Sequence, residues 1–522
     1  MRRSPGVVCL SLGVLIGSAC AREAPSEAEA VAPVPEAPPP APPPLPGPPP
    51  PAPEVQGALA WTHETPDGYD SDVYRWLDSA GRPRVAVLTR NDMRDPGGSH
   101  GGMLRRYRFP VGAGERVATG TGAHGLWNGW GYVVSHADDG AAVSHSAGLP
   151  GAWRHVFLGA NHAVHEFSWT LPLAGVPVHV TAHWFFATGR DHPVFAVTFD
   201  SSAAGSGGLR INADSRTPYG DIAWDGDGTQ AWVDGVRWGD RYRFASRTEP
   251  LTAASDWDYS QPNTVPFVSV YSRAADAEMG MVQTLDWVQH NTGGSWFHDN
   301  WGRTAATRAH GDLFRDWRMP PDWNWPYQVC QYEMDSFHPT RSKRLAWGLM
   351  YGAVGKTAYS GYGLDRVLTG HPYQSYSLFV VLGAWSLEPV RAQGVEVEHA
   401  LQARLRVVRG AEVSEGPGGV ARADSVRYAV SGYNSVYGVH ELRADAAGGF
   451  AVELDAAGGA LLHPVFLIQG ARGPPRGVTL DGEPLQAGVD YFASFDASTG
   501  ALWLTVSRRW QGRHLLADAW GE

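Results

Sequence analysis

Aromatic and hydrogen-bonding side chains concentrate between Asp286 and Tyr376, and together they offer the residue types that a sugar site needs. A pyranose presents an apolar C–H face that stacks on an indole ring, and a rim of hydroxyls that needs fixed polar partners. Tryptophan is also a good core residue, so the competing interpretation is that these rings pack an aromatic-rich interior. Six tryptophans lie in the first half of the stretch: Trp287, Trp296, Trp301, Trp317, Trp323 and Trp325.

Polar side chains alternate with these rings, and we expect them to bind substrate together. An indole would supply the stacking platform, while amide, imidazole and guanidinium groups would hold the hydroxyls. The substrate-binding candidates are His290, Asn291, Trp296, Asn300, Trp301, Trp323, Trp325 and Arg341.

The titratable residues of the same stretch suit β-elimination of a uronic-acid glycoside. That reaction needs a group that neutralises the carboxylate, a base for the C5 proton and an acid for the leaving oxygen. His298 is the first choice for proton transfer, because imidazole titrates near neutral pH and Trp296, Asp299 and Asn300 flank it. The other candidates for this chemistry are Arg303, Tyr327, His338, His371 and Tyr373.

Hydrolysis of a glycosidic bond is the second reaction that the stretch could catalyse, with Glu333 and Asp335 as the pair of carboxylates. On a strand these carboxylates share one face about 7 Å apart, near the separation of inverting glycosidases. The acid and the base of a glycosidase usually approach the sugar from opposite sides, however. An ion-paired surface with Arg341 and Arg344 is an equally good interpretation of the pair.

No metal site and no cofactor are predicted. His162 and His165 are three residues apart, which places them on opposite faces of a strand. His179 and His183 share a face but are separated by about 13 Å along the strand. Residues 225–229 have the acid spacing of a calcium loop, but the rest of the EF-hand pattern is missing, and a tight Asp-Gly turn fits better.

The pattern of the chain is β almost throughout. Alternating or β-branched runs recur between clusters of Gly, Pro, Asn and Asp, whereas helical periodicity is scarce. The clearest expected strands are Arg84 to Thr89, Gly131 to Ser135, Val164 to Leu171, Val178 to Ala187, Val194 to Asp200, Phe267 to Ser272 and Met279 to Leu285.

Composition limits which classes of protein this chain can belong to. The net charge of −11 includes no basic block, so nucleic-acid binding is unsupported. About 470 residues follow Glu54, which is ample for a large core. Besides Cys9 and Cys20 the chain has only Cys330, so we expect no intramolecular disulfide in the mature protein.

Two long expected strands flank a turn within Pro177 to Ser202. The turn reads Gly189-Arg190-Asp191-His192-Pro193, in which Gly tolerates positive φ, Asp can close an Asx-turn and Pro begins the next strand. This run resembles the paired long strands of the galactose-mutarotase-like β-supersandwich, and the resemblance covers residues 60 to 390 as a pattern. It implies a fold shared by sugar epimerases and by domains of polysaccharide lyases and glycoside hydrolases. Lyases of this kind often use His, Tyr, Arg and Asn, but no motif here carries a catalytic residue over by position.

The chain from about Gly394 indicates a separate, smaller β-sandwich. Val395 to Val408 alternates strictly and predicts a strand, and two hairpins follow near Asp481-Gly482 and through Ala497 to Gly500. In the second hairpin, Leu502, Leu504 and Val506 should face one way, and Trp503, Thr505 and Ser507 the other. The last run resembles the accessory β-sandwich that ends many glycoside hydrolases.

The first twenty residues resemble a bacterial lipoprotein signal. Arg2 and Arg3 precede an apolar run from Val7 to Ile16, and small residues lead to Cys20, the predicted lipidation site. An ordinary secretory signal cut near Ala19 or Ala21 is the alternative. Between residues 31 and 53, fourteen of twenty-three residues are proline, which predicts an extended polyproline spacer.

The sequence therefore predicts an all-β protein: signal 1–20, spacer 21–54, a large supersandwich 55–393 and a C-terminal β-sandwich 394–522. We expect an exported, membrane-anchored lipoprotein, periplasmic or at the cell surface, that cleaves a polysaccharide or oligosaccharide by β-elimination or hydrolysis. The alternative is a surface lipoprotein that binds carbohydrate without turnover.

Replacing the predicted lipid attachment residue tests the anchor. Cys20→Ser should release the protein from membranes while the folded part stays intact, because the spacer separates the anchor from the predicted domains. Membrane fractionation followed by immunoblotting measures this. A Cys20→Ser protein that stays in the membrane fraction would contradict the lipoprotein interpretation.

Overall fold

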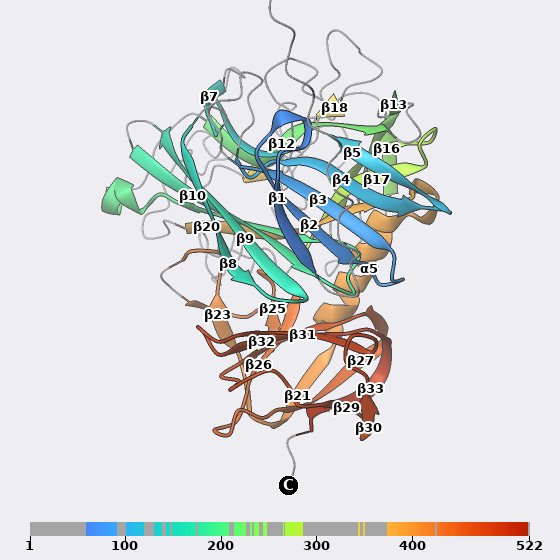
Figure 1. The fold of residues 1–522 in the computed structure, drawn as a ribbon. Helices are drawn as coiled ribbons and strands as arrows, with labels where there is room; N and C mark the ends of the chain where they lie inside the picture. The colour runs from blue at the N-terminus through green and yellow to red at the C-terminus, as the bar shows by residue number, and fades with distance from the viewer. Residues whose placement is uncertain are drawn as a thin grey trace, which may run out of the picture. The chain divides into compact units, whose positions relative to one another are not determined.

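The structure, a computed structural model, describes residues 59–90, 101–119, 130–137, 142–146, 149–173, 176–207, 213–225, 230–231, 234–239, 244–247, 265, 267–285, 343–344, 348–349, 373–422 and 425–519. Residues Glu54–Glu522 form one compact unit. Within the described ranges the protein is all-β apart from one α-helix and short 3-10 turns (Figure 1). None of the described helices is long and apolar enough to cross a membrane.

The first large sheet contains most of the N-terminal strands. Eight strands follow one another through antiparallel pairs, and three short strands, β13, β18 and β19, pair with β12. The path is β1 (Ala60–Glu64), β2 (Ser71–Leu77), β3 (Pro83–Thr89), β4 (Leu104–Val111), β5 (Gly114–Thr119), β12 (Ala213–Asp225), β6 (Trp130–Ala137) and β7 (Ala142–His145), with β13 (Gln230–Ala231), β18 (Lys343–Arg344) and β19 (Gly348–Leu349) beside it.

The second large sheet is also antiparallel, and its strands come from two distant parts of the sequence. β20 is inserted between β17 and β11, so the segment that follows residue 372 returns to the middle of this sheet. The order is β15 (Phe244–Arg247), β14 (Gly235–Gly239), β16 (Phe267–Ser272), β17 (Ala277–Gln283), β20 (Tyr373–Gly383), β11 (Val194–Asp200), β10 (Val176–Ala187), β9 (His162–Leu173) and β8 (Gly151–Leu158).

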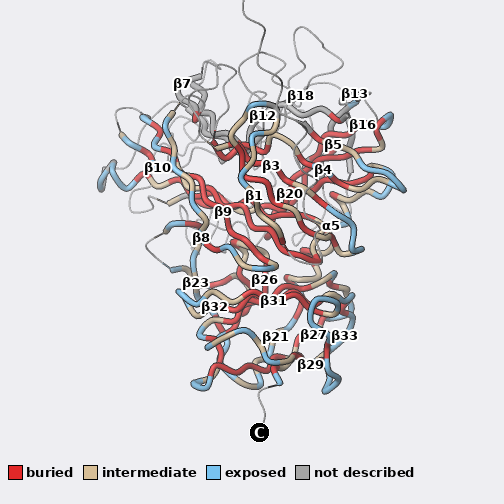
Figure 2. Tube along the Cα trace, in the orientation of Figure 1, coloured by how far each residue is buried: buried red, intermediate tan, exposed pale blue. Residues whose placement is uncertain are grey.

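An aromatic core joins the two sheets. Tyr74 of β2 stacks on Phe186 of β10 with ring centroids 4.5 Å apart, and Trp76 lies 5.2 Å from the same ring. Tyr107 of β4 contacts Trp76 edge-on at 5.8 Å. These four rings are all at most 1% exposed. The sheets therefore form the predicted large sandwich, and Figure 2 shows the buried segments running along β3, β9 and β20.

The long strand pair expected within Pro177 to Ser202 is confirmed. β10 pairs with β11 from His179↔Asp200 to Phe185↔Val194, on either side of the Gly189–Pro193 turn. Both strands are buried on both faces, from Ala182 to Ala187 and from Val194 to Phe199. One face meets the first sheet, and the other meets the C-terminal part of the chain.

The C-terminal part forms the smaller sandwich that the sequence predicts. A five-stranded sheet has the order β21 (Arg404–Arg409), β27 (Ala451–Leu462), β33 (Arg509–Asp518), β29 (Val478–Leu480) and β30 (Glu483–Leu485). The facing sheet has the order β22 (Ala411–Glu412), β26 (Val439–Arg443), β28 (Val465–Gln469), β32 (Ala501–Val506) and β31 (Tyr491–Asp496), with β25 (Tyr433–Asn434) beside β26. A separate two-stranded ladder joins β23 (Glu415–Pro417) to β24 (Ser425–Arg427).

Strand β32 confirms the predicted alternation, and it explains how the sandwiches meet. Leu502, Leu504 and Val506 lie in the core between the two C-terminal sheets. Trp503 lies in the core shared with the large sandwich, where its ring is 4.9 Å from that of Phe185. Both faces of this strand are therefore buried.

Helix α5 (Pro389–Gln402) corrects the strand expected over Val395 to Val408. Val390, Val397 and Leu401 are buried at helical spacing, and Pro389 occupies the first turn, where proline is well tolerated. Only the end of the expected strand is extended, as β21. Helix α5 is continuous through residues 393 and 394, where the sequence predicts the division between the two domains. That division stays a prediction.

The other expected strands agree with the structure to within a few residues. β3, β6, β9, β10, β11, β16 and β17 occupy the predicted runs. β12 and β13 pair on either side of residues 226–229, as the expected Asp-Gly hairpin turn requires. The two C-terminal hairpins are formed by β29 with β30 and by β31 with β32.

Truncating Trp503 tests whether the shared core holds the two sandwiches together. This side chain is 6% exposed and contacts the rings of Phe157, Phe185 and Tyr437. Trp503→Ala should lower the free energy of unfolding by about 3–5 kcal/mol, measured by denaturant titration. Val489→Ala, at a site that is 56% exposed, is the control and should change it little. If Trp503→Ala lowers the free energy of unfolding as little as Val489→Ala does, the shared core does not hold the two sandwiches together.

Candidate functional site

Nearly all site residues predicted from the sequence lie outside the described residues. This holds for Cys20 and for His290, Asn291, Trp296, His298, Asn300, Trp301, Arg303, Trp323, Trp325, Tyr327, Glu333, Asp335, His338, Arg341 and His371. Their assignment therefore stays a prediction.

Tyr373 is the predicted site residue that the structure describes. It begins β20, pairs in register with Asp200 of β11, and is half-buried. The guanidinium of Arg422 lies over its ring, 5.1 Å from the centroid. β20 is three strands from β9 in the sheet, or about 14 Å at ordinary strand spacing.

A different group of polar and aromatic side chains comes together where β1 and β2 face β8 and β9. We call it the β1–β8 cluster, and two antiparallel registers build it. Trp61 lies opposite Tyr74, and His155 lies opposite His165, so the members of each pair share a face of their sheet. Its members are Trp61, Asp72, Tyr74, Arg90, Trp153, His155 and His165.

A hydrogen-bonded chain runs from the interior of the cluster to its half-buried edge. The hydroxyl of Tyr74 is 2.6 Å from Nδ1 of the fully buried His165 and 2.9 Å from Nε2 of His155. His155 is half-buried, and no described residue is hydrogen-bonded to its other ring nitrogen, Nδ1. The chain thus ends on one imidazole nitrogen at the edge of the sandwich.

The position of Asp72 favours one order of protons along this hydrogen-bonded series, although Nε2 of His165 makes no hydrogen bond to a described residue. Nε2 of His165 lies 4.0 Å from the carboxylate of Asp72, which favours a proton on that nitrogen. Nδ1 of His165 then accepts the hydrogen bond from the Tyr74 hydroxyl. The oxygen of Tyr74 in turn accepts from Nε2–H of His155. Nδ1 of His155 is left with a lone pair, which is the form of a general base.

The pKa values agree with this arrangement. Burial lowers the pKa of His165 to about 3 and also lowers that of His155, so both rings are neutral at pH 7. Burial and the nearby Asp72 raise the pKa of Tyr74 above its ordinary value, and the phenol keeps its proton. The hydrogen-bonded series therefore consists of three neutral side chains, those of His155, Tyr74 and His165, next to the carboxylate of Asp72.

Asp72 is the anchor of the cluster. Its carboxylate accepts a hydrogen bond from the indole N–H of Trp61 at 2.8 Å and two from Arg90 at 2.8 and 3.0 Å. The guanidinium of Arg90 also lies over the ring of Trp153, 3.7 Å from its centroid. Trp153 stacks on His165, and Trp61 contacts His155 edge-on at 4.7 Å. The two half-buried tryptophans thus flank the half-buried imidazole.

The opposite face of β9 carries a second polar group. The carboxylate of Glu166 accepts two hydrogen bonds from Arg154, at 2.6 and 2.9 Å, and contacts Nε2 of His183 at 2.9 Å. Burial alone would raise the pKa of Glu166, but these two partners lower it to about 2. Nδ1 of His183 reaches the hydroxyl of Tyr437, so this group ties the large sandwich to the C-terminal one.

The predicted orientation of His162 and His165 on opposite faces of a strand is confirmed. His165 faces the first sheet, whereas His162 faces the C-terminal sandwich, where it contacts Ser494 and Thr505. Among the described residues, no group of three His, Cys, Asp or Glu side chains is arranged to hold a metal ion.

Sequence reasoning missed the β1–β8 cluster, although two short signals were present. Residues 72, 74 and 76 form an alternating acid–aromatic row, and residues 153 and 155 form a second row of Trp and His. Each row reads as an ordinary strand with one polar and one apolar side. Only the packing of β2 against β8 and β9 shows that the two rows meet.

The buried His165 predicts a loss of stability in acid. The unfolded imidazole takes up a proton below its ordinary pKa of 6.5, whereas the folded one does so only near 3. Between these pH values the free energy of unfolding should fall by about 1.4 kcal/mol per pH unit from this group alone. His165→Gln should reduce that slope by this amount in denaturant titrations at pH 4 to 6. Phe167→Leu, a buried neighbour without a titratable group, should lower stability but keep the slope; an unchanged slope in His165→Gln would show that the imidazole is not held neutral.

No model of a known protein family matches this chain, and no curated protein matches it. The solved structures that are similar to it include the following two. One is an alpha-mannosidase from Enterococcus faecalis V583, with 8% identity and a TM-score of 0.30 over 85% of this chain and 41% of that chain. The other is a GalM/aldose epimerase homologue from C. elegans, with 9% identity and a TM-score of 0.25 over 60% of this chain and 98% of that chain. The match therefore spans about two fifths of the length of the mannosidase.

Proposed function

We propose that this chain is an exported carbohydrate-active protein that cleaves a uronic-acid polysaccharide by β-elimination, with His155 as the base. The observation that carries the proposal is the imidazole of His155 at the half-buried edge of the sandwich: Tyr74 holds its Nε2, and no described residue is hydrogen-bonded to its Nδ1. The tautomer that Asp72 favours in the hydrogen-bonded series through His165 and Tyr74 would leave the lone pair on this nitrogen. A fixed neutral imidazole is suited to abstract a proton near neutral pH.

The surroundings of His155 suit a sugar. Trp61 is half-buried and its indole N–H is bound to Asp72, so its ring is held in one orientation. An indole fixed in this way can stack on the C–H face of a pyranose, as the tryptophan-rich Asp286–Tyr376 stretch was also expected to do. Holding the sugar on Trp61 would bring a ring proton towards His155.

Elimination fits the described residues better than hydrolysis does. Glycosidases ordinarily use two carboxyl groups on either side of the scissile bond. In the β1–β8 cluster Asp72 is the carboxylate, and Trp61 and Arg90 occupy its oxygens. Glu166 projects from the opposite face of β9 and is bound by Arg154 and His183. The cluster thus offers a base without a pair of carboxyl groups.

The proposed reaction is balanced as follows. Nδ1 of His155 takes the C5 proton, the C5–H electrons form the C4=C5 double bond, and the C4–O bond breaks. The leaving oxygen takes a proton from an acid, and a cation or amide neutralises the uronate carboxylate. We assign these two tasks to the sequence-predicted candidates of the Asp286–Tyr376 stretch: Arg303 and Asn300 for the carboxylate, and His298 or Tyr327 for the leaving oxygen.

A second candidate function is binding of carbohydrate without turnover, and the cluster can also support it. Asp72, Arg90 and Trp153 form a fixed group whose contacts are satisfied within the protein, as in a rigid binding platform. In that case Trp61 would matter for affinity, and the protonation of His155 would not matter for any rate.

A glycan panel combined with His155 variants separates these functions. On uronic-acid polysaccharides the protein should increase the absorbance of unsaturated uronate, and His155→Ala should lower kcat/KM by about 10²–10⁴-fold. Because burial holds the pKa of His155 below 6.5, kcat/KM should fall only as the pH drops below that value. Val156→Ala, on the same strand and 38% exposed, is the matched control.

Three other outcomes of that experiment would change the assignment. New reducing ends without the absorbance would indicate hydrolysis. Saturable binding without products, weakened by Trp61→Ala but not by His155→Ala, would indicate a binding protein. Full elimination activity in a folded His155→Ala variant would contradict the role of His155 as the base.

A further inference from the structure

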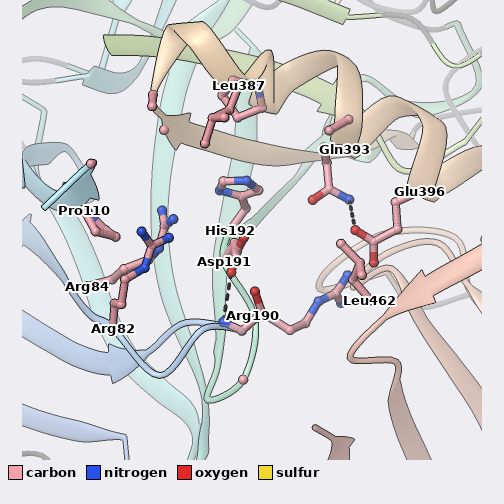
Figure 3. A pocket seen from close by; sticks show the side chains of 17 residues that line it. Arg82, Arg84, Pro110, Arg190, Asp191, His192, Leu387, Gln393, Glu396 and Leu462 are labelled. Atoms are coloured by element: carbon pink, nitrogen blue, oxygen red, sulfur yellow. Dashed lines mark hydrogen bonds between the residues drawn. The ribbon is translucent and has the colours of Figure 1, made fainter. Parts of the chain in front are cut away.

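A cavity of about 210 Å³ lies where the large sandwich meets α5 and β27, away from the β1–β8 cluster. We call it the junction pocket, and Figure 3 shows charged and polar side chains converging on it from three elements. Arg84 comes from β3, Arg190, Asp191 and His192 come from the turn between β10 and β11, and Glu396 comes from α5.

The turn that carries three of these residues is firmly held. The indole N–H of Trp76 donates to the carbonyl of Arg190 at 2.8 Å, and the carboxylate of Asp191 accepts from the backbone N–H of Ser79 at 2.9 Å. Arg190 itself donates to the carbonyl of Gly438 at 3.1 Å. The pocket wall is therefore preorganised, which lowers the cost of ordering it when a ligand binds.

His192 points to a ligand. It is only 9% exposed and lines the pocket, and its Nδ1 has no hydrogen-bond partner in the described structure. Burial and the nearby Arg84 and Arg190 lower its pKa to about 3, so the ring is neutral. A buried polar atom without a partner is unfavourable. Nδ1 is itself shielded from solvent, so a ligand hydroxyl would satisfy it after a small movement of the ring towards the pocket.

Positive and negative side chains of the junction pocket nearly balance each other when the buried residue next to its lining, Asp78, is included. Arg82, Arg84 and Arg190 line the cavity, and Asp191 and Glu396 oppose them. Behind the wall, the buried Asp78 pairs with Arg84 at 3.4 Å and with Arg82 at 3.3 Å. Burial raises the pKa of Glu396 to about 7. These three arginines and three carboxyl groups sum to zero when Glu396 is ionised, which is its main form above pH 7. A neutral ligand is then matched better than a cation or an anion.

We propose that the junction pocket binds a neutral, polyhydroxylated molecule the size of one sugar ring. Its polar wall mixes donors and acceptors, namely the guanidinium of Arg190, the imidazole of His192 and the amide and carboxyl groups of Gln393 and Glu396. Pro110, Leu387 and Leu462 supply apolar surface for C–H groups. The volume is below the 300–1,000 Å³ of drug-sized sites, which limits the ligand to about one ring.

Binding of neutral monosaccharides to the full chain tests this proposal. Glucose, galactose and mannose are titrated separately by calorimetry, with glucuronate as the charged comparison. We expect saturable binding of at least one neutral sugar, more tightly than glucuronate at pH 7.5. Ala392→Trp should weaken it at least tenfold, because residue 392 is an exposed part of the pocket lining and an indole there would fill the cavity.

The controls separate this pocket from other sites and from misfolding. Gln402→Trp, exposed on the same helix and outside the pocket, should leave binding unchanged. Trp61→Ala should also leave it unchanged, so failure of the proposed function at the β1–β8 cluster would not affect this result. If Ala392→Trp lowers the melting temperature, Leu387→Trp replaces it, since Leu387 lines the pocket and is 75% exposed.

The proposal is overturned by any of three results. They are the absence of saturable binding by all three neutral sugars, tighter binding of glucuronate than of every neutral sugar, and binding that survives the folded cavity-filling variant. A fourth result, binding that Trp61→Ala abolishes, would place the sugar at the β1–β8 cluster and overturn the proposal as well.

Discussion

Burial of the second large sheet on both of its faces is the constraint on which the rest of the structure depends. β10 and β11 have apolar side chains on each side, directed alternately to the first sheet and to the C-terminal sandwich. Phe186 packs on Tyr74, while its neighbour Phe185 packs on Trp503. Because successive residues of a strand point in opposite directions, one register fixes both cores, and a slip of one residue would exchange them.

This double burial also determines how the polar residues of the sheet behave. A polar side chain on either face loses its water and needs a protein partner. His162 meets the hydroxyls of Ser494 and Thr505, His165 meets Tyr74, and Glu166 meets Arg154 and His183. Burial lowers the pKa values of His162 and His165 to about 3, so the imidazoles act as neutral hydrogen-bonding groups. The partners of His162 and His165 lie on segments far apart in the sequence, which ties the layers together at defined points.

The sequence predicts the strands well because their signal is local. The alternation of β32 and the Gly189–Pro193 turn each depend on a few adjacent residues, and both agree with the structure. The stretch around α5 misled the same reasoning, because Val395 and Val397 alternate with glutamates as strand residues do. The helical spacing of Val390, Val397 and Leu401 is equally present there, and the packing of α5 against β17 and β27 decides between them.

The β1–β8 cluster could not be predicted for a different reason. Its central hydrogen bond joins Tyr74 to His165, 91 positions apart, and no periodicity within either strand indicates which residues will face each other. The candidates between Asp286 and Tyr376 are predicted from their closeness in the sequence, and they stay a prediction because nearly all of them lie outside the described residues. In a sandwich, neighbouring strands also bring together residues that are distant in the sequence, as in this cluster.

One row of side chains connects the candidate site to the junction pocket. Asp72, Tyr74 and Trp76 point the same way from β2, and Asp78 follows directly after the strand. Asp72 anchors the cluster, Trp76 holds the turn that carries His192, and Asp78 pairs with Arg84 in the pocket wall. The row spans about 20 Å at the usual rise of a strand. The two sites therefore share one structural support, and the register of β2 between β1 and β3 sets the geometry of both.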